Sequence, residues 1–212
     1  MIKQILFDFD GVIIDSMDVR DEGFRAIVEG HNEALIDKFI AYHRYNAGLS
    51  RYVKIRYFYE TLLGKTISED EVNALADKFS QIMKKRLVSS DVLIPKTIDF
   101  IKDIHAQIPL HIVSGSDEQE LNFLCKELNI DHYFVTIEGS PAPKNELVKN
   151  IMNTYNYNPN ETLLIGDSIN DYDAAKINGL YFVGFNNEDL SSVSDIYVDV
   201  IDNKILDVYH AY

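Results

Sequence analysis

Two acidic residues interrupt an apolar stretch near the start of the chain, where Asp8 and Asp10 stand within residues 5–11. If residues 5–9 are extended, side chains two positions apart point to the same side, so both carboxylates lie together at the strand end. Two carboxylates held close raise each other's pKa unless a cation or a shared proton relieves them. This pair therefore indicates chemistry, and Gly11 permits the sharp turn that follows.

A simpler interpretation makes Asp10-Gly11 the turn of a β-hairpin, because Asp-Gly is a strong hairpin signal. Residues 5–7, however, form a continuous apolar run, which is typical of a strand buried on both faces of a parallel sheet, and no alternating strand follows. We therefore favour a functional site at the end of a buried strand.

The elements that must position this pair follow two patterns. Residues 16–90 lack strand-like runs, and Ser68 with Glu71 forms a capping box that opens a helix. The apolar residues of that helix repeat at helical spacing, at Val72, Leu75, Ala76, Phe79, Ile82 and Met83. Breaks between the earlier helices are expected at Gly30, Gly48 and Gly64.

From residue 91 onwards, helices and strands alternate. Helices are predicted at 95–105, 117–128, 145–155 and 169–177, and strands at 110–113, 133–137, 162–165 and 181–183. This alternation predicts an α/β fold with a Rossmann-like parallel sheet core, covered by helices on both faces. The predicted core comprises residues 1–15 and 91–212, with 16–90 as a helical cap domain inserted after the first strand.

Ligands of such sheets bind beyond the carboxyl ends of the strands, so the residues that follow each strand are candidates. Ser114 and Gly115 follow the 110–113 strand, Lys144 follows the 133–137 strand, and Asp167 with Asp171 follows the 162–165 strand. A carboxylate directly after an apolar strand, as Asp167 is, loses hydration and needs a partner. Lys144 is unusual too, because cations are mildly disfavoured at helix starts.

Capping offers a structural interpretation of two further residues. Ser116 with Gln119 forms a predicted capping box, and the free amides of that helix start would offer an anion site beside Ser114. Asp171 completes a similar box with Ser168, and on its own it would be structural.

Composition limits the classes of function. The net charge of −14 over 212 residues argues against nucleic acid or an anionic membrane as partner, because the summed field repels polyanions. The first strand begins within a few residues of the start and no run approaches a bilayer span, so we expect a cytoplasmic protein. Cys125 is expected to be a packed core thiol, and no histidines are spaced as zinc ligands.

The motifs Asp8-Phe9-Asp10-Gly11-Val12, Ser114, Lys144 and Gly166-Asp167-Ser168-x-x-Asp171 resemble, in this order, those of the haloacid dehalogenase-like hydrolases. The position of the helical insertion is similar to the branch that contains phosphoglycolate phosphatases, sugar-phosphate phosphatases and β-phosphoglucomutases. The resemblance implies a phosphatase that acts on a small phosphorylated substrate, and a monomer is compatible with it.

The resemblance also implies a role for each matched residue. Asp8 would be the nucleophile that becomes phosphorylated, and Asp10 the general acid and base. The phosphoryl group would be held by Ser114, Gly115 and Lys144. Mg²⁺ would be ligated by Asp8, the main-chain carbonyl of Asp10, and Asp167, with assistance from Asp171. Independently of the family, an oxygen-rich acidic pocket suits this hard cation.

Alternatives remain open within and beyond this family. In β-phosphoglucomutases, the residue that corresponds to Arg20 is a histidine, so Arg20 favours a phosphatase over a mutase. The segment Gly48-Leu49-Ser50-Arg51, however, is similar to the mutases' cap loop. Asp10 argues against dehalogenation. Phosphonate hydrolysis depends on a cap lysine, and the sequence places none at the site. A receiver-like signalling module would share the acids, hydroxyl and lysine without the insertion.

The inserted segment carries a local reversal of charge. Between Asp37 and Glu60 it holds no carboxylate, but it does hold Lys38, Arg44, Arg51, Lys54 and Arg56. Guanidinium groups bind phosphate or carboxylate oxygens in pairs, so Arg51, and with it Arg44, is predicted to recognise the non-reacting end of the substrate. The lysines Lys38 and Lys54 are predicted to lie on a solvated helix face.

Overall fold

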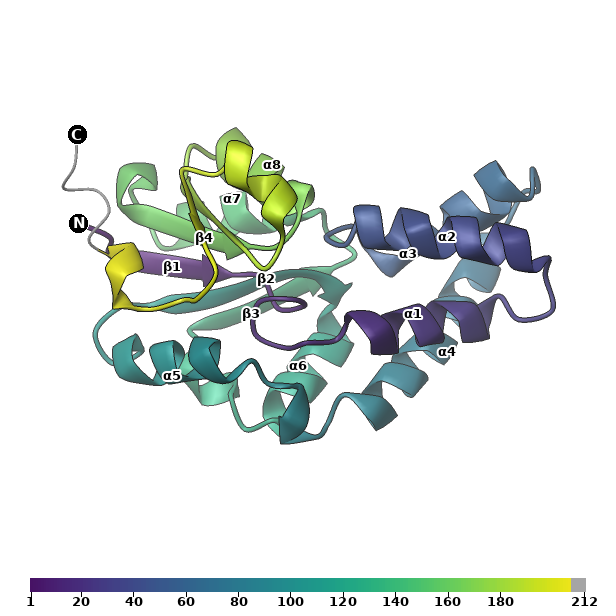
Figure 1. Ribbon diagram of the computed structural model, residues 1–212, viewed down its shortest axis with the longest axis horizontal. Coiled ribbons are helices and arrows are strands. Elements are labelled where there is room, and N and C mark those ends of the chain that lie inside the picture. Colours follow the sequence, from purple (N-terminus) through teal and green to yellow (C-terminus); the bar gives the residue numbers. More distant parts are fainter. Residues whose placement is uncertain (207–212) are drawn as a thin grey trace.

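A six-stranded parallel sheet organises the computed structural model, which describes residues 1–206 (Figure 1). The strands lie in the order β3-β2-β1-β4-β5-β6. Their bounds are β1 (Gln4–Phe7), β2 (Leu110–Asp117), β3 (Thr136–Ser140), β4 (Thr162–Gly166), β5 (Tyr181–Phe185) and β6 (Ile196–Val198). Since β1 pairs in parallel with both β2 and β4, no hairpin follows it. Residues 207–212 of the predicted core lie outside the described residues.

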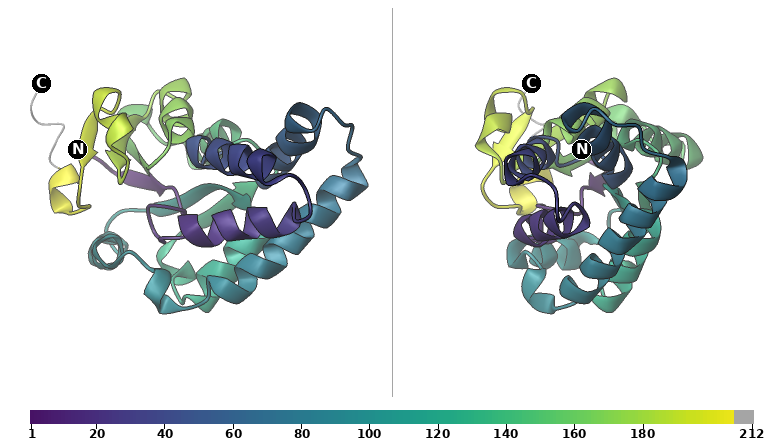
Figure 2. Two further views of the ribbon diagram at one scale, coloured as in Figure 1. Left: turned by 45° about the vertical axis from the view of Figure 1, so that its right-hand side comes forward. Right: turned by 90° about the vertical axis from the view of Figure 1, so that its right-hand side faces the viewer.

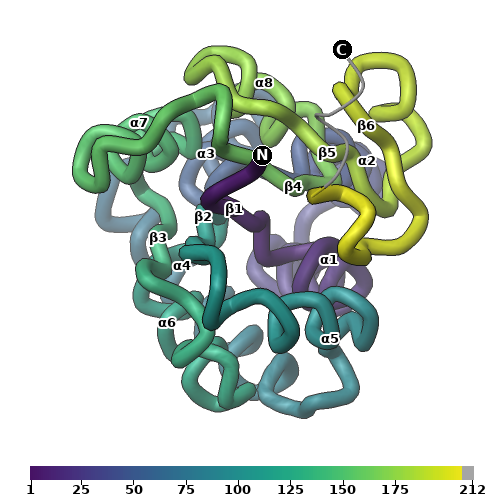
Figure 3. Tube along the Cα trace, turned by 90° about the vertical axis from the view of Figure 1, so that its left-hand side faces the viewer, coloured from purple at the N-terminus to yellow at the C-terminus, as the bar shows by residue number. Residues whose placement is uncertain are grey.

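Helices cover both faces of the sheet, as predicted. Along β1, Ile5 and Phe7 join the apolar cluster on one face, while Leu6 joins the cluster on the other. Figure 3 shows α5 (Pro95–Ile104) and α6 (Glu118–Glu127) on the first face and α7 (Lys144–Thr154) and α8 (Ile169–Ile177) on the second. Burial on both faces is the physical reason for the uninterrupted apolar run of β1.

A bundle of helices, here called the cap segment (residues 16–90), follows β1 and lies beyond the carboxyl end of that strand (Figures 1 and 2). It contains α1 (Met17–Ile27), α2 (Glu33–Tyr45), α3 (Arg51–Arg56) with a π-helical continuation (Tyr57–Leu62), and α4 (Glu69–Arg86). The predicted capping box is present, since the Ser68 and Glu71 side chains each bind the other's backbone amide. The interior of the cap segment is aromatic, with Phe24, Phe39, Phe58 and Phe79 buried.

The two chain segments that join the cap segment to the sheet run side by side. Ile14 and Leu93 form an antiparallel bridge. The amide of Asp15 donates to the carbonyl of Val92 at 2.8 Å, and the amide of Ile94 donates to the carbonyl of Ile13 at 2.9 Å. The cap segment is therefore attached to the sheet by two adjacent chain segments that are joined by two backbone hydrogen bonds.

Three predicted boundaries were wrong. The strand predicted at 133–137 begins only at Thr136, because the 3₁₀ turn Asp131–Tyr133 intervenes before the chain reaches its partner β2. Strand β2 continues past Val113, through a shift of register, to Asp117. Ser114 and Gly115 consequently lie within the irregular end of a strand rather than after it. The third case is Ser116, which does not cap a helix: the Asp117 side chain accepts from the amide of Glu120 instead.

The edge strand β6 was not predicted, because its three residues give too short a pattern. The remaining short helices are 3₁₀ turns at Ser90–Val92, Pro159–Glu161, Glu188–Ser192 and Asn203–Leu206. Among the described residues, no helix is both long enough and apolar enough to cross a membrane.

Candidate active site

Asp8 and Lys144 meet at the carboxyl edge of the sheet. Asp8, directly after β1, is buried, and its Oδ1 lies 2.8 Å from Nζ of Lys144. The same ammonium donates to Oδ1 of Asp171. Burial alone would lower the pKa of Lys144, but Asp171 and Asp8 outweigh it and raise that pKa above its ordinary value. These two carboxylates explain a lysine at the first position of α7, where the helix dipole disfavours a cation.

Asp171 serves both the helix and the site. Its Oδ2 accepts from the amide of Ser168 at 3.0 Å and from the hydroxyl at 2.6 Å, which completes the predicted capping box at the start of α8. Its other oxygen accepts from Lys144. The structural interpretation of Asp171 is thus confirmed. The capping box with Ser168 also fixes the Asp171 carboxylate that binds Lys144.

Three carboxylates form a group that fits a hard cation. Asp8, Asp167 and Asp171 each offer an oxygen atom within 4.8 Å of the others. Oδ1 of Asp167 is buried and has no hydrogen-bond partner among the described residues. Burial, and then the charges of Asp8 and Asp171, raise the pKa of Asp167 well above its ordinary value. A buried, unpaired carboxylate oxygen in an all-oxygen donor set is the arrangement that a divalent cation such as Mg²⁺ relieves.

The same crowding acts on Asp8 and on the backbone beside it. Burial and the charge of Asp171 raise the pKa of Asp8 to about 7, although Lys144 opposes this shift. Gly11 has φ of +74°, and a Cβ at this position would collide with the Asp167 carboxylate. Glycine is required here both for the left-handed turn and for the close approach of the third acid.

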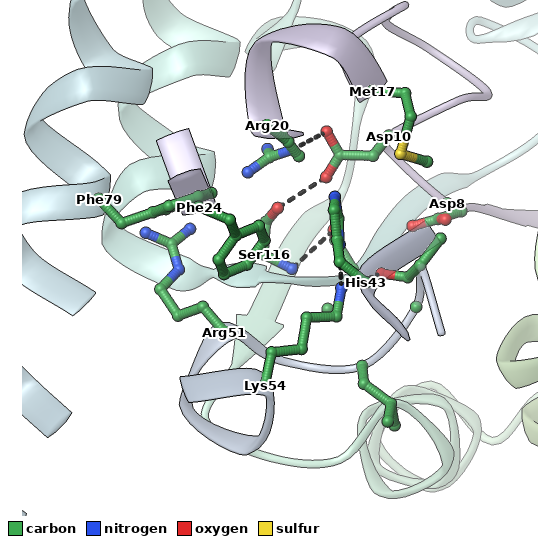
Figure 4. Close-up of a pocket in the computed structure, with 15 residues that line it drawn as sticks. Asp8, Asp10, Met17, Arg20, Phe24, His43, Arg51, Lys54, Phe79 and Ser116 are labelled. Carbon is green, nitrogen blue, oxygen red and sulfur yellow. Dashed lines mark hydrogen bonds and ion pairs between the residues drawn. The ribbon is translucent and has the colours of Figure 1, made fainter. Parts of the chain in front are cut away.

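Asp10 accepts hydrogen bonds from both sides of the site. Its Oδ1 accepts from Nε of Arg20 at 2.5 Å and its Oδ2 accepts from Oγ of Ser116 at 2.7 Å (Figure 4). Oδ1 also accepts from Oγ of Ser16 at 2.5 Å. Burial raises the pKa of Asp10, but the charge of Arg20 and the two hydroxyls outweigh burial and hold it below its ordinary value. The two acids therefore have different partners, and their environments push their pKa values apart.

A small cavity of about 30 Å³ joins these groups to the cap segment. The core contributes Asp8, Asp10, Ser114, Gly115 and Ser116, and the cap segment contributes Arg20, His43, Arg51 and Lys54 among others. The α3 helix that carries Arg51 begins at the Ser50 cap, at the predicted loop-to-helix junction. The cap loop packs closely on the core, because a Cβ on Gly115 would collide with the carbonyl of Gly48.

Arg44 does not join this site. It lies on α2 with about half of its side chain exposed and pairs with Asp18 at 2.9 Å and with Asp21 at 2.6 Å. Its guanidinium is thus occupied by two acids of α1. The prediction rested on the guanidinium chemistry that Arg44 shares with Arg51, but the two arginines stand on different helices and only Arg51 lines the cavity.

Two arginines of the cap segment share one carboxylate of the core. Nη1 of Arg51 lies 2.6 Å from Oε2 of Glu120, and Nη1 of Arg20 lies 3.2 Å from Oε1 of the same residue. Beyond these bonds, Nη2 of Arg20 and both Nε and Nη2 of Arg51 are buried without a partner among the described residues. Both arginines line the cavity, so donors remain available to an anionic or hydroxylated ligand.

Lys54 is a residue that sequence reasoning missed. It was predicted on a solvated face, but it is 3% exposed, with Nζ 3.0 Å from Nδ1 of His43 and 2.9 Å from the carbonyl of Ala47 (Figure 4). Burial, and then the charge of Arg20, lower the pKa of Lys54 to about 7, although Asp10 and Asp8 oppose this shift. A signal was present: Lys54 follows Arg51 by three residues and so shares its helix face.

We expect Lys54→Met to stabilise the protein at neutral pH. The folded pKa lies below the unfolded value of 10.5, so protonation opposes folding, and this penalty grows as pH falls from 10.5 towards 7. Removing it should raise the free energy of unfolding at pH 7 by about 1–3 kcal/mol, after the loss of the His43 and Ala47 contacts is deducted. The gain should shrink as pH approaches 10, which urea unfolding at both pH values measures.

Lys38→Met is the matched control, since Lys38 is exposed on α2. It should leave the pH dependence of unfolding unchanged. If Lys54→Met instead lowered stability and kept the wild-type slope between pH 7 and 10, Lys54 would be a structural residue that the fold needs.

With this geometry established, comparisons with known proteins identify the family. The model of the haloacid dehalogenase-like hydrolases matches residues 2–179. The chain belongs to this family and is therefore an enzyme of a hydrolase class. The family resemblance and the predicted α/β fold are confirmed.

Solved structures share the fold at low identity. The β-phosphoglucomutase of Clostridium difficile has 21% identity and a TM-score of 0.81, with 100% of this chain and 99% of that chain covered. CbbY of Rhodobacter sphaeroides, solved as a mutant with xylulose-(1,5)bisphosphate, has 17% identity and a TM-score of 0.75, with 94% of this chain and 95% of that chain covered. The HAD-hydrolase YfnB of Bacillus subtilis, solved with magnesium, has 18% identity and a TM-score of 0.72, with 98% of this chain and 100% of that chain covered.

Proposed function

We propose that this protein is a Mg²⁺-dependent phosphatase that hydrolyses a small phosphomonoester through an aspartyl phosphate on Asp8. The observation that carries this proposal is the contact of Asp8 with the ammonium of Lys144 and its grouping with Asp167, whose buried Oδ1 has no hydrogen-bond partner among the described residues. A nucleophilic carboxylate in such a place can approach a phosphate only if positive charge offsets their repulsion. Lys144 supplies part of that positive charge. A cation bound by Asp8, Asp167 and Asp171 can supply the remainder.

In the first step, a carboxylate oxygen of Asp8 attacks phosphorus, and the bond between phosphorus and the ester oxygen breaks. The cycle requires Asp10 to be protonated at this point, against the effect of Arg20 on its pKa, and Asp10 gives this proton to the departing oxygen. In the second step, Asp10 takes a proton from water as the water oxygen attacks the aspartyl phosphate, which releases phosphate and restores Asp8. Ser16, Arg20 and Ser116 hold the Asp10 carboxylate in a fixed orientation for both transfers.

The phosphoryl group would be bound by Ser114 and Gly115, near the carboxyl end of β2, and by Lys144, at the first position of α7. Asp8, the Asp10 carbonyl and Asp167 would hold Mg²⁺, with Asp171 assisting directly or through water. When bound, the cation supplies charge stabilisation to the phosphoryl oxygens. Lys144 adds a fixed positive charge aimed at the same oxygens.

The cationic side of the cavity supports recognition of a second polar end of the substrate. Within residues 1–206, Arg51 has two buried nitrogens without a partner, and Lys54 uses two of the three hydrogens that an ammonium carries. We assign them to the non-reacting end, which would carry a second anionic group or sugar hydroxyls. Arg44, which faces solvent with its own acidic partners, has no part in this assignment.

Substrate entry requires movement of the cap segment. A cavity of about 30 Å³ holds on the order of two water molecules, whereas sites for small organic ligands span roughly 300–1,000 Å³. We therefore propose that residues 16–90 act as a cap domain, which opens about the paired connections at Ile14 and Leu93 and closes to exclude water.

Phosphate release from a panel of phosphomonoesters tests this function. The panel should pair esters that carry a second anionic group with matched esters that lack it, each assayed with Mg²⁺ and with EDTA. We expect turnover with Mg²⁺ and a loss of at least about 10³-fold with EDTA, since the metal supplies several kcal/mol of charge stabilisation. Esters with the second group should be preferred.

Full activity in EDTA would contradict the mechanism. Conversion of a sugar 1-phosphate to its 6-phosphate without release of phosphate would instead make the enzyme a mutase. A receiver-like module is no longer an alternative, because the family is a hydrolase family and the strand order here differs from the 2-1-3-4-5 order of receiver folds.

A further inference from the structure

Glu120 is a buried acid for which the proposed reaction has no direct use. It lies in the first turn of α6, where an acid is ordinarily explained by the helix dipole. That explanation does not account for its burial, because Glu118 of the same turn is exposed while Glu120 has no exposed surface. Burying a carboxylate is unfavourable unless cations accompany it.

The cations that accompany Glu120 both come from the cap segment. Each carboxylate oxygen of Glu120 pairs with one arginine. Oε1 contacts Arg20 on α1, and Oε2 contacts Arg51 on α3. The same nitrogen of Arg51 also donates to Ser80 on α4 at 2.5 Å. Glu120 of the core thus contacts arginines of two cap helices, and Arg51 also contacts a third cap helix. The two contacts with Glu120 cross the boundary that must separate when the cap segment opens, whereas the Arg51–Ser80 bond lies within the cap segment.

Arg20 extends this connection to the reacting groups. Its Nη1 lies against Glu120 while its Nε donates to Oδ1 of Asp10, so a single planar guanidinium joins the two carboxylates. The guanidinium can satisfy both only when the cap segment is closed, because Arg20 belongs to α1 and both acids belong to the core. The orientation of Asp10 and the closure of the cap segment are therefore set by the same contact.

We propose that Glu120 is a positioning residue that holds the cap segment closed and, through Arg20, fixes Asp10 for proton transfer. This inference rests on the proposed phosphatase function for its catalytic part only. Glu120 does not line the cavity and touches no substrate. It keeps one edge of each guanidinium occupied, so that Nη2 of Arg20 and the Nε and Nη2 of Arg51 are left for the ligand.

Glu120→Gln keeps the shape of the side chain and removes the charge that both arginines share. We expect kcat/KM to fall on the order of 10²-fold, as for a misplaced catalytic group, because Arg20, which holds Asp10, loses the carboxylate that fixes its own position. Glu127→Gln is the matched control: it makes the same change on the same helix at an exposed position, and it should leave kcat/KM unchanged. A loss of the same size in Glu127→Gln would overturn the proposal.

A double-mutant cycle separates positioning from general destabilisation. If Glu120 acts through Arg20, adding Glu120→Gln to Arg20→Met should lower kcat no further than Arg20→Met alone. Arg20→Lys keeps the charge but replaces the separate Nε and Nη1 donors that reach Asp10 and Glu120 with a single nitrogen, so it should reproduce the loss even if Glu120→Gln does not fold. Additive losses in the cycle, or a fully active Arg20→Lys enzyme, would overturn the proposal.

Cap closure provides a readout that needs no activity. Dyes on Lys38→Cys in the cap segment and Lys149→Cys in the core report their separation by energy transfer, since the native Cys125 is buried. Glu120→Gln should shift the distance distribution of the ligand-free protein to longer values, and an unchanged distribution would overturn the proposal. If the wild-type protein released no phosphate from any ester, the proposed function would fail while this measurement still tested Glu120.

Discussion

Asp8→Asn is expected to abolish turnover while the protein stays folded. An amide oxygen is a far weaker nucleophile than a carboxylate, so the first step stops. The loss should be at least about 10⁴-fold in kcat, the scale reached when a covalent nucleophile is removed. Acid quenching of the wild-type enzyme during turnover should trap a phosphorylated protein, seen by mass spectrometry as a modification of Asp8, and the variant should show none.

The control for this change is Asp70→Asn, an acid-to-amide substitution at an exposed position of α4. It should retain wild-type turnover and give the same trapped species. An Asp8→Asn enzyme within tenfold of wild type, with its circular dichroism spectrum intact, would show that another group attacks phosphorus and would end the aspartyl phosphate mechanism.

Asp10→Asn is expected to separate the two steps of the reaction. The amide keeps the size of the side chain but cannot carry the proton, so turnover of an alkyl phosphate should fall about 10²- to 10⁴-fold. An ester such as 4-nitrophenyl phosphate needs little protonation of its leaving group. With this ester the variant should still phosphorylate Asp8 and then stall, because Asp10 no longer activates water.

Stopped-flow absorbance measures this directly, as a burst of about one nitrophenol per active site followed by slow release. Asp15→Asn, an exposed acid in the same connecting segment, serves as the control and should behave as wild type. Equal slowing of both esters without a burst would mean that Asp10 acts before phosphoryl transfer, as a structural partner of Arg20 alone.

Much of the fold could be predicted because local patterns carry it. The apolar run of β1 reflects burial on both faces, and the alternation of helices and strands after residue 91 reflects parallel crossovers. Capping boxes such as Ser68 with Glu71 mark helix starts by hydrogen bonds within one turn. Strand boundaries were less predictable, because the ladder from β2 to β3 depends on a partner distant in sequence.

The part of the site that the sequence could indicate lies at strand ends. Asp8, Lys144, Asp167 and Asp171 come together because parallel strands deliver their carboxyl ends to one edge. The apolar context of Asp8 and Asp167 already marked them, since a carboxylate beside a buried strand needs a partner. The roles proposed for them still depend on the experiments above.

The cap segment shows what only the tertiary structure decides. Arg44 and Arg51 have the same chemistry and stand seven positions apart, but Arg44 meets the acids of α1 while Arg51 meets Glu120 across the closed interface. Lys54 was indistinguishable by type from the exposed Lys38 and is nevertheless buried beside His43. Sequence sets which charges a helix carries, whereas the packing of one helix against another sets which of them lose water and which partner each one finds.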